Sequence, residues 1–193
     1  MGSSFAVRDA GNFSRKKRRE AALFFMIQSP LGWLGVVETP KGVSALLREK
    51  GLRAVLRRKI LLRYPAAVEK RGVFSKKTDA FLRAYFKGRR TLPPVPLDLS
   101  SQTPFQKKVL GRVGRIPRGR FRTYRWLAQR VRCPGGVRAC GQALHRNPVP
   151  LLIPCHRVVR TSKGIGGFAW GKEIKRRLLQ IEAPRRNVHG RTP

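Results

Sequence analysis

The most informative stretch of the chain reads Asn147-Pro148-Val149-Pro150-Leu151-Leu152-Ile153-Pro154-Cys155-His156-Arg157-Val158-Val159. Three prolines restrict its backbone, and the apolar residues 151–153 are expected to anchor it in a core. Cys155 would then lie at the end of a buried run, with His156 beside it. A thiolate is the reactive form of cysteine, and a neighbouring imidazole can take the thiol proton. Considered alone, the pair fits a buried structural thiol beside a loop histidine better than a reactive pair.

Helices are predicted upstream of this stretch. Thr103 is a candidate N-cap, with Pro104 at the first helical position. The apolar positions of residues 124–131 repeat at helical spacing, and the sequence Cys-Pro-Gly-Gly at 133–136 ends that helix. A further short helix is expected over residues 137–144. Two helices joined by a tight turn that contains glycine are typical of a helix-turn-helix, although the spacing fits any helical hairpin equally well.

The helix at 137–144 favours contact with nucleic acid. Arg138 stands near its start, and small residues follow at Ala139, Gly141 and Ala143. Small residues let a helix approach a narrow groove, and an arginine at the entry can reach into the base stack. Helix–helix packing would also use alanine and glycine, so both interpretations stay open on the pattern alone.

The first hundred residues have a different pattern. Apolar runs at 23–28, 33–38 and 42–47 are separated by turn residues, which predicts an antiparallel meander. Residues 46–90 are mostly helical in pattern, and the prolines within 91–101 predict a domain linker. The predicted organisation is a flexible basic arm (1–20), an N-terminal α/β domain (21–100), a C-terminal domain (101–185) and a tail (186–193).

The net charge points to a polyanionic partner. Lysine and arginine total 44, of which 30 are arginine, against nine acidic residues, so the formal charge is +35. This composition excludes an acidic small-molecule enzyme, a collagen and a multi-pass membrane protein. Hydrophobic residues make up 41% of the chain, so it can fold. Nucleic acid is the first candidate partner and an anionic membrane surface the second.

Cysteine usage and the apolar runs indicate an intracellular protein. Cys133 and Cys140 could bridge, but two reduced, buried thiols are the preferred interpretation. The cysteines and histidines lack zinc-site spacing. The apolar run at 21–27 is too short for a membrane span and is interpreted as a buried strand, so we expect a cytoplasmic protein with no membrane contact. Sparse asparagine with abundant arginine favours a thermophile.

The run Pro154-Cys155-His156-Arg157-Val158, preceded by Asn147-Pro148-Val149-Pro150, resembles the active-site signature of the O6-alkylguanine-DNA alkyltransferases, also called methylated-DNA–protein-cysteine methyltransferases. The resemblance covers residues 103–183. It implies an α/β fold, with a small antiparallel sheet and helices in the N-terminal domain and a mostly helical, winged-helix-like C-terminal domain. It also implies single-turnover DNA repair, in which the base is flipped out and its alkyl group moves irreversibly to a cysteine.

The resemblance assigns three catalytic residues. Cys155 matches the alkyl acceptor, His156 the residue that deprotonates it through a water, and Glu182 the carboxylate that orients the histidine. Asn147 matches a hinge between the recognition helix and the cysteine segment. No cofactor is implied. Some relatives hold a structural zinc in the N-terminal domain, but no cysteine precedes residue 133 here, so we expect no metal.

The resemblance also assigns contacts to DNA. Arg138 matches an arginine that replaces the extruded nucleotide, and Tyr124 a tyrosine that helps to rotate the phosphate and offers a proton to guanine. Ala139 and Gly141 would lie on the recognition helix. The predicted base pocket comprises Leu144, Pro150, Val158, Phe168 and Ala169. The family often has Tyr and Ser where this chain has Phe168 and Ala169, so a hydroxyl contact is lost while the backbone N–H of Ala169 remains.

The expected partner is double-stranded DNA that contains O6-alkylguanine, bound by a monomer. The alternatives are a non-catalytic protein that binds alkylated DNA and a basic helix-turn-helix protein that binds DNA by charge. The first would lack an acceptor cysteine, which Cys155 supplies, and the second would not need Pro-Cys-His-Arg.

Overall fold

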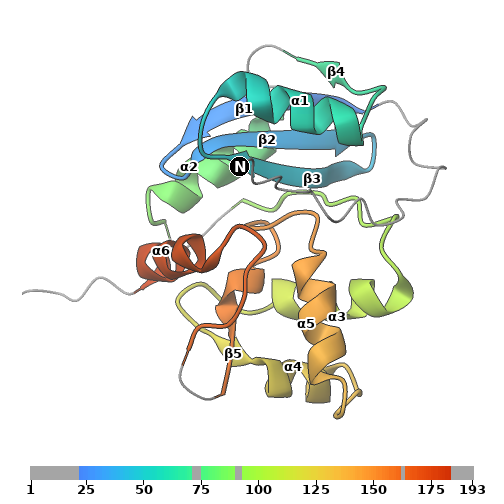
Figure 1. Cartoon of the computed structure of the whole chain (residues 1–193), viewed down its shortest axis with the longest axis vertical. Coiled ribbons are helices and arrows are strands. Elements are labelled where there is room, and N and C mark those ends of the chain that lie inside the picture. Colours follow the sequence, from blue (N-terminus) through green and yellow to red (C-terminus); the bar gives the residue numbers. More distant parts are fainter. Residues whose placement is uncertain (1–21, 71–74, 90–92, 162–163, 184–193) are drawn as a thin grey trace, which may run out of the picture.

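The computed structural model describes residues 22–70, 75–89, 93–161 and 164–183. The predicted basic arm at 1–20 and tail at 186–193 lie outside these residues. In Figure 1 the sheet with α1 and α2 forms one half of the molecule and α3, α4 and α5 form the other, with α6 where the halves meet. The predicted fold class is confirmed.

The N-terminal sheet is built on the predicted meander. Strands β1 (Leu23–Ser29), β2 (Gly32–Thr39) and β3 (Gly42–Glu49) pair antiparallel in chain order. Gly32 and Gly42 have φ of +98° and +129°, values that residues with a Cβ avoid, so glycine suits both turns. The sheet order is β3-β2-β1-β4.

Residues 46–90 depart in part from the predicted helical pattern. Strand β3 extends to Glu49, and β4 (Val68–Glu69) pairs parallel with β1 between helices α1 (Arg53–Arg63) and α2 (Lys76–Phe86). A strand of two residues is too short to show an alternation of apolar and polar side chains. Its pairing with β1 depends on the position at which the chain leaves α1. The sequence pattern therefore has no signal for β4.

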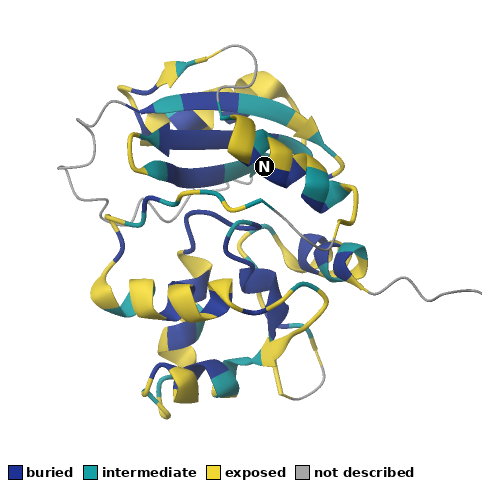
Figure 2. Ribbon diagram, turned by 180° about the vertical axis from the view of Figure 1, so that it is seen from behind, coloured by how far each residue is buried: buried dark blue, intermediate teal, exposed yellow. Residues whose placement is uncertain are grey.

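Alternation along the strands separates two apolar clusters. Phe24 on β1 packs in the cluster that includes Leu56 and Ile60 of α1, while Phe25 packs in the cluster that includes Leu82 and Tyr85 of α2. Successive side chains of a strand point to opposite faces, so both faces are covered by helices. Figure 2 shows the buried residues running through the strands and the centre of the helical half.

The cluster that contains Phe25 continues into the C-terminal half. It also holds Val109, Leu127 and Cys155, so one core spans both halves. Backbone hydrogen bonds reinforce the junction: the N–H of Leu46 on β3 donates to the carbonyl of Pro148 at 2.8 Å. The proline-rich segment lies along the same strand, since the N–H of Val43 donates to the carbonyl of Pro96 at 2.9 Å.

The predicted C-terminal helices are confirmed. α3 (Pro104–Gly114) begins with a capping box between Thr103 and Gln106, and α4 (Tyr124–Arg130) is capped by Thr123. α5 (Val137–His145) follows, and α6 (Lys172–Glu182) is the last described helix. The short strands β5 (Arg122–Thr123) and β6 (Val158–Val159) pair parallel, and β6 directly follows the 3-10 turn η2 (Cys155–Arg157).

All three cysteines lie in the described ranges and are free. The expectation of reduced thiols at 133 and 140 is confirmed, but Cys133 is only partly buried, because it lies in the turn between α4 and α5. None of the described helices has the length and apolar character to cross a membrane.

Candidate active site

Cys155 is buried at the start of η2, with 4% of its surface exposed. The side chain of Asn147 donates to the carbonyl of Ile153 at 2.9 Å and to the Cys155 sulfur at 3.1 Å. Its own oxygen accepts from the N–H of Val149 at 3.1 Å. One amide therefore holds both ends of the proline-rich stretch and contacts the thiol.

The thiol of Cys155 is protonated at neutral pH. Burial raises its pKa to about 11, although the hydrogen bond from Asn147 and the charge of Lys175 oppose that rise. A protonated thiol is a poor nucleophile. Rapid chemistry at this sulfur therefore requires a base within reach.

His156 has the form of such a base. Its ring is fully buried, and Nε2 lies 2.8 Å from Glu182 Oε1. Burial lowers the pKa of the imidazole despite the neighbouring carboxylate, so the ring is neutral. A neutral ring that donates from Nε2–H to a carboxylate has its lone pair on Nδ1. Nδ1 is buried and has no hydrogen-bond partner among the described residues, so it is available to take a proton.

Glu182, the last residue of α6, is held by several donors. Arg157 donates from Nε to Oε2 at 2.7 Å and from Nη2 to Oε1 at 2.9 Å, while the Tyr85 hydroxyl donates to Oε1 at 2.8 Å. Burial alone would raise the pKa of Glu182, but the bonds from His156 and Arg157 outweigh burial and lower it. The carboxylate is therefore ionised, and Arg157 balances its charge.

Lys175 is a further buried ion that faces this region. Its ammonium donates to the carbonyls of Val158 at 2.6 Å and Gly167 at 3.2 Å, and lies 5.8 Å from the centre of the Tyr124 ring. Burial lowers its pKa to about 8, and the nearby Cys155 opposes that shift. Lys175 thus joins β6 to the glycine-rich loop and places a positive charge near the thiol.

Tyr85, Lys175 and the ion-pair role of Arg157 are missing from the residues predicted from the sequence. The spacing of α6 carries a signal for Lys175, because residues 174, 175, 178 and 182 fall on one helical face and all are buried. Tyr85 carries no such signal. It lies in the N-terminal half, and only the packing of α2 brings it to Glu182.

Of the predicted DNA-contact residues, Gly141 and Tyr124 lie close together. Arg138 and Ala139 are exposed on α5. A Cβ on Gly141 would lie 3.9 Å from the Tyr124 ring, and a Cβ on Gly166 would lie 3.1 Å from it. Gly166 also has φ of +76°, so glycine is required there twice over. The structure thus brings α5, Tyr124 and the glycine-rich loop together.

The predicted base-pocket residues differ in how far they are buried. Leu144 and Val158 are buried in the cluster that contains Cys155, and the Phe168 ring lies 6.2 Å from that of His156, centre to centre. Pro150 is buried and Ala169 is exposed.

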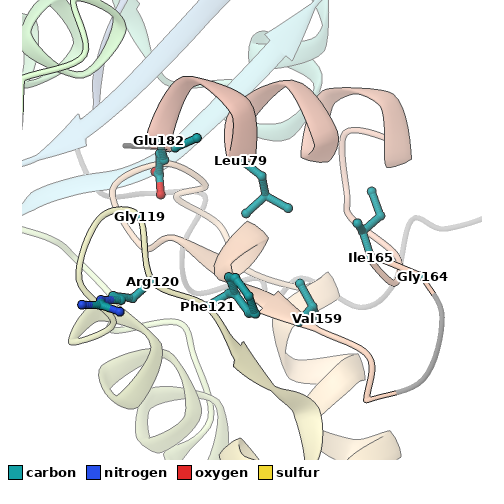
Figure 3. A pocket seen from close by; sticks show the side chains of 9 residues that line it. Gly119, Arg120, Phe121, Val159, Gly164, Ile165, Leu179 and Glu182 are labelled. Carbon is teal, nitrogen blue, oxygen red and sulfur yellow. The ribbon is translucent and has the colours of Figure 1, made fainter. Parts of the chain in front are cut away.

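An apolar cavity of about 450 Å³ lies between α6, β6 and the loop before β5, and Glu182 is one of its lining residues (Figure 3). Its lining includes Phe121, Val159, Ile165 and Leu179 and none of the predicted base-pocket residues. Within the described ranges, no group of three or more His, Cys, Asp or Glu side chains could hold a metal ion.

Comparison with known proteins gives one consistent result. The family described as "6-O-methylguanine DNA methyltransferase, DNA binding domain" matches residues 104–184. A constitutive methylated-DNA–protein-cysteine methyltransferase of Bacillus subtilis is 45% identical over 102 residues, which span 52% of this chain and 61% of that protein. A methylated-DNA–protein-cysteine methyltransferase of Methanosarcina barkeri is 36% identical over 151 residues, or 76% of this chain and 94% of that protein.

Solved structures agree. The Mycobacterium tuberculosis OGT in complex with DNA is 32% identical, with a TM-score of 0.71 over 84% of this chain and 96% of that one. The O6-methylguanine-DNA methyltransferase of Pyrococcus kodakaraensis is 29% identical, with a TM-score of 0.63 over 83% of this chain and 99% of that one.

Replacing Glu182 by Gln tests the buried ion pair. We expect Glu182→Gln to lower the free energy of unfolding at neutral pH by about 3 kcal/mol, because Arg157 loses its counter-charge. The folded-state pKa of Glu182 is below its ordinary value of 4.5, so its contribution is complete above that pH and is lost on acidification. Urea unfolding should therefore show the difference from the wild type shrinking as the pH falls below about 4.5.

Glu173→Gln is the matched control, since Glu173 is exposed in the first turn of the same helix. It should change the free energy of unfolding by less than about 0.5 kcal/mol. A Glu182→Gln variant as stable as the wild type at neutral pH would contradict the ion-pair assignment.

Proposed function

Because this chain belongs to the methylated-DNA–protein-cysteine methyltransferase family, we propose that it repairs duplex DNA by moving the alkyl group of O6-alkylguanine onto its own Cys155. The observation that carries the proposal is the linked set Cys155, His156 and Glu182, in which Nδ1 of the histidine is free to accept a proton. All three residues come from one chain, so a monomer is sufficient for the proposed reaction.

The reaction begins with the thiol. Its proton passes through a water to Nδ1 of His156, and the resulting imidazolium is stabilised by the carboxylate of Glu182. Arg157 keeps that carboxylate ionised, and the ammonium of Lys175 favours the thiolate. His156 and Lys175 therefore lower the free-energy cost of forming a buried thiolate on Cys155.

The thiolate then attacks the alkyl carbon on O6 of guanine. The sulfur–carbon bond forms as the carbon–O6 bond breaks, and the electrons of the broken bond move into the guanine. The guanine takes up one proton, for which the hydroxyl of Tyr124 is the proposed donor, and the proton held by His156 returns through water to Tyr124. A thioether remains on Cys155. No group in the site can cleave this bond, so each molecule acts once.

The lesion must first leave the duplex. Flipping a nucleotide costs a few kcal/mol of stacking, and an alkylated guanine pairs weakly, which lowers that cost. Arg138 projects from α5 where it can fill the space left by the base, and the excess of arginine attracts the phosphates on either side. Asn147 joins the end of α5 to the reactive stretch, as expected of a hinge.

Mass measurement tests the reaction. After mixing with duplex DNA that carries O6-methylguanine, the intact protein should gain one methyl group in place of one hydrogen, and Cys155→Ala should gain none. Cys140→Ala is the matched control, because Cys140 is also a buried free thiol and should not affect transfer. An unmodified wild type that still binds the lesion would favour a non-catalytic DNA-binding protein.

Arg138→Ala tests the role of α5. We expect repair of duplex DNA to slow at least about tenfold, because nothing offsets the lost stacking. Reaction with free O6-benzylguanine should keep its rate, since that base needs no flipping. Arg58→Ala, on the exposed face of α1, is the control for loss of one charge. Equal slowing with the free base would place the defect in the pocket and refute the role given to Arg138.

A further inference from the structure

Tyr85 connects the N-terminal half of the molecule to the proposed catalytic carboxylate. It lies near the end of α2, is fully buried, and donates from its hydroxyl to Glu182 Oε1 at 2.8 Å. The same hydroxyl is 3.4 Å from Nε2 of His156. It is therefore an N-terminal side chain that contacts both members of the histidine–carboxylate pair.

The position of Tyr85 is fixed from several sides. Its neighbours Phe81 and Leu82 belong to the shared apolar core. The guanidinium of Arg118 lies 4.8 Å from the centre of the Tyr85 ring, and its Nη2 donates to the carbonyl of Ile181 at 2.8 Å. The Tyr85 hydroxyl and the Arg118 side chain that packs on the Tyr85 ring therefore both donate hydrogen bonds to the last turn of α6.

That last turn requires such support. Glu182 is the final residue of α6, where the last backbone carbonyls of a helix have no partner within the helix. Nε2–H of His156 meets Oε1 only if the carboxylate keeps one orientation. Arg157 donates hydrogen bonds to both carboxylate oxygens, and these bonds favour rotation of the carboxylate toward Arg157 and away from His156. The Tyr85 hydroxyl is a further donor to Oε1 and opposes that movement.

The hydroxyl acts as a donor to Glu182. Burial, together with the negative charge of Glu182, raises the pKa of Tyr85 above its ordinary value, so it stays protonated. A phenylalanine would fill the same space without placing a polar group in the core. Among the described residues the hydroxyl finds its polar partners in the catalytic pair, which links its presence to that pair.

We propose, on the basis of the function proposed above, that Tyr85 is a positioning residue that acts through Glu182 to hold His156 with Nδ1 toward the thiol. The N-terminal domain would then complete the active site as well as support it. Without the hydroxyl, Glu182 turns toward Arg157, its bond to His156 weakens, and proton transfer from Cys155 slows.

This role has a signature in the pH dependence of alkylation. With His156 in place, Cys155 reacts well below the pKa of about 11 that burial gives its thiol. When the base is misplaced, the reaction relies on direct ionisation of the thiol and rises with pH. The ratio of wild-type to variant rate should therefore be largest near neutrality and shrink toward alkaline pH.

The test compares Tyr85→Phe with the wild type in reaction with free O6-benzylguanine, which removes DNA binding from the measurement. We expect the full-length variant to react about tenfold more slowly near pH 7 and within about twofold near pH 10. Tyr64→Phe is the matched control, because Tyr64 is also a buried N-terminal tyrosine and lies in the other apolar cluster. It should behave as the wild type.

A double-mutant cycle separates positioning from packing. If Tyr85 acts through Glu182, Tyr85→Phe should have almost no effect in a Glu182→Gln background. Circular dichroism of each variant establishes that it is folded at the assay temperature. Wild-type rates for Tyr85→Phe, a loss of rate that is the same at every pH, or full additivity with Glu182→Gln would each overturn the proposal. A wild type that does not react would instead refute the proposed function.

Discussion

The carboxylate of Glu182 is the interaction on which the rest of the site depends. It accepts hydrogen bonds from His156, Arg157 and Tyr85, which come from two separate parts of the chain. A buried carboxylate is costly unless its charge is balanced and its oxygens are satisfied. Here Arg157 balances the charge, and the remaining donors fix the orientation. The neutral histidine therefore has one defined tautomer and a free Nδ1.

The fold is arranged so that these donors meet. The apolar core is continuous between the sheet half and the helical half, and β3 is bonded to the reactive stretch through Leu46 and Pro148. α2 brings Tyr85 to Glu182, and η2 brings His156 and Arg157 to the same carboxylate. The buried thiol with a raised pKa and the buried base with a lowered pKa are neighbours in the chain, and both lie in the site that these contacts hold together.

Local patterns were sufficient to predict most of the secondary structure. The three-strand meander, the cap at Thr103 and the helices after it follow from spacing and turn residues. Cys155 and His156 are predicted because their segment matches a family signature. Without that match, the pattern around Glu182 predicts only an ordinary helix end. Local spacing does not predict the role of Tyr85, because its contact with Glu182 joins residues 97 positions apart in the chain. Lys175 is one of several basic residues of α6, and its spacing from Ile174, Leu178 and Glu182 is the signal that places it on the buried face.

The central claim is that Glu182 holds His156 as a neutral base with its lone pair on Nδ1. Nitrogen-15 NMR of the imidazole in the unreacted protein tests this claim most directly, since it reports which ring nitrogen carries the proton. At neutral pH the account predicts a proton on Nε2 alone, in a hydrogen bond to Glu182, and none on Nδ1. A proton on Nδ1, either in the other neutral tautomer or in an imidazolium, would contradict it.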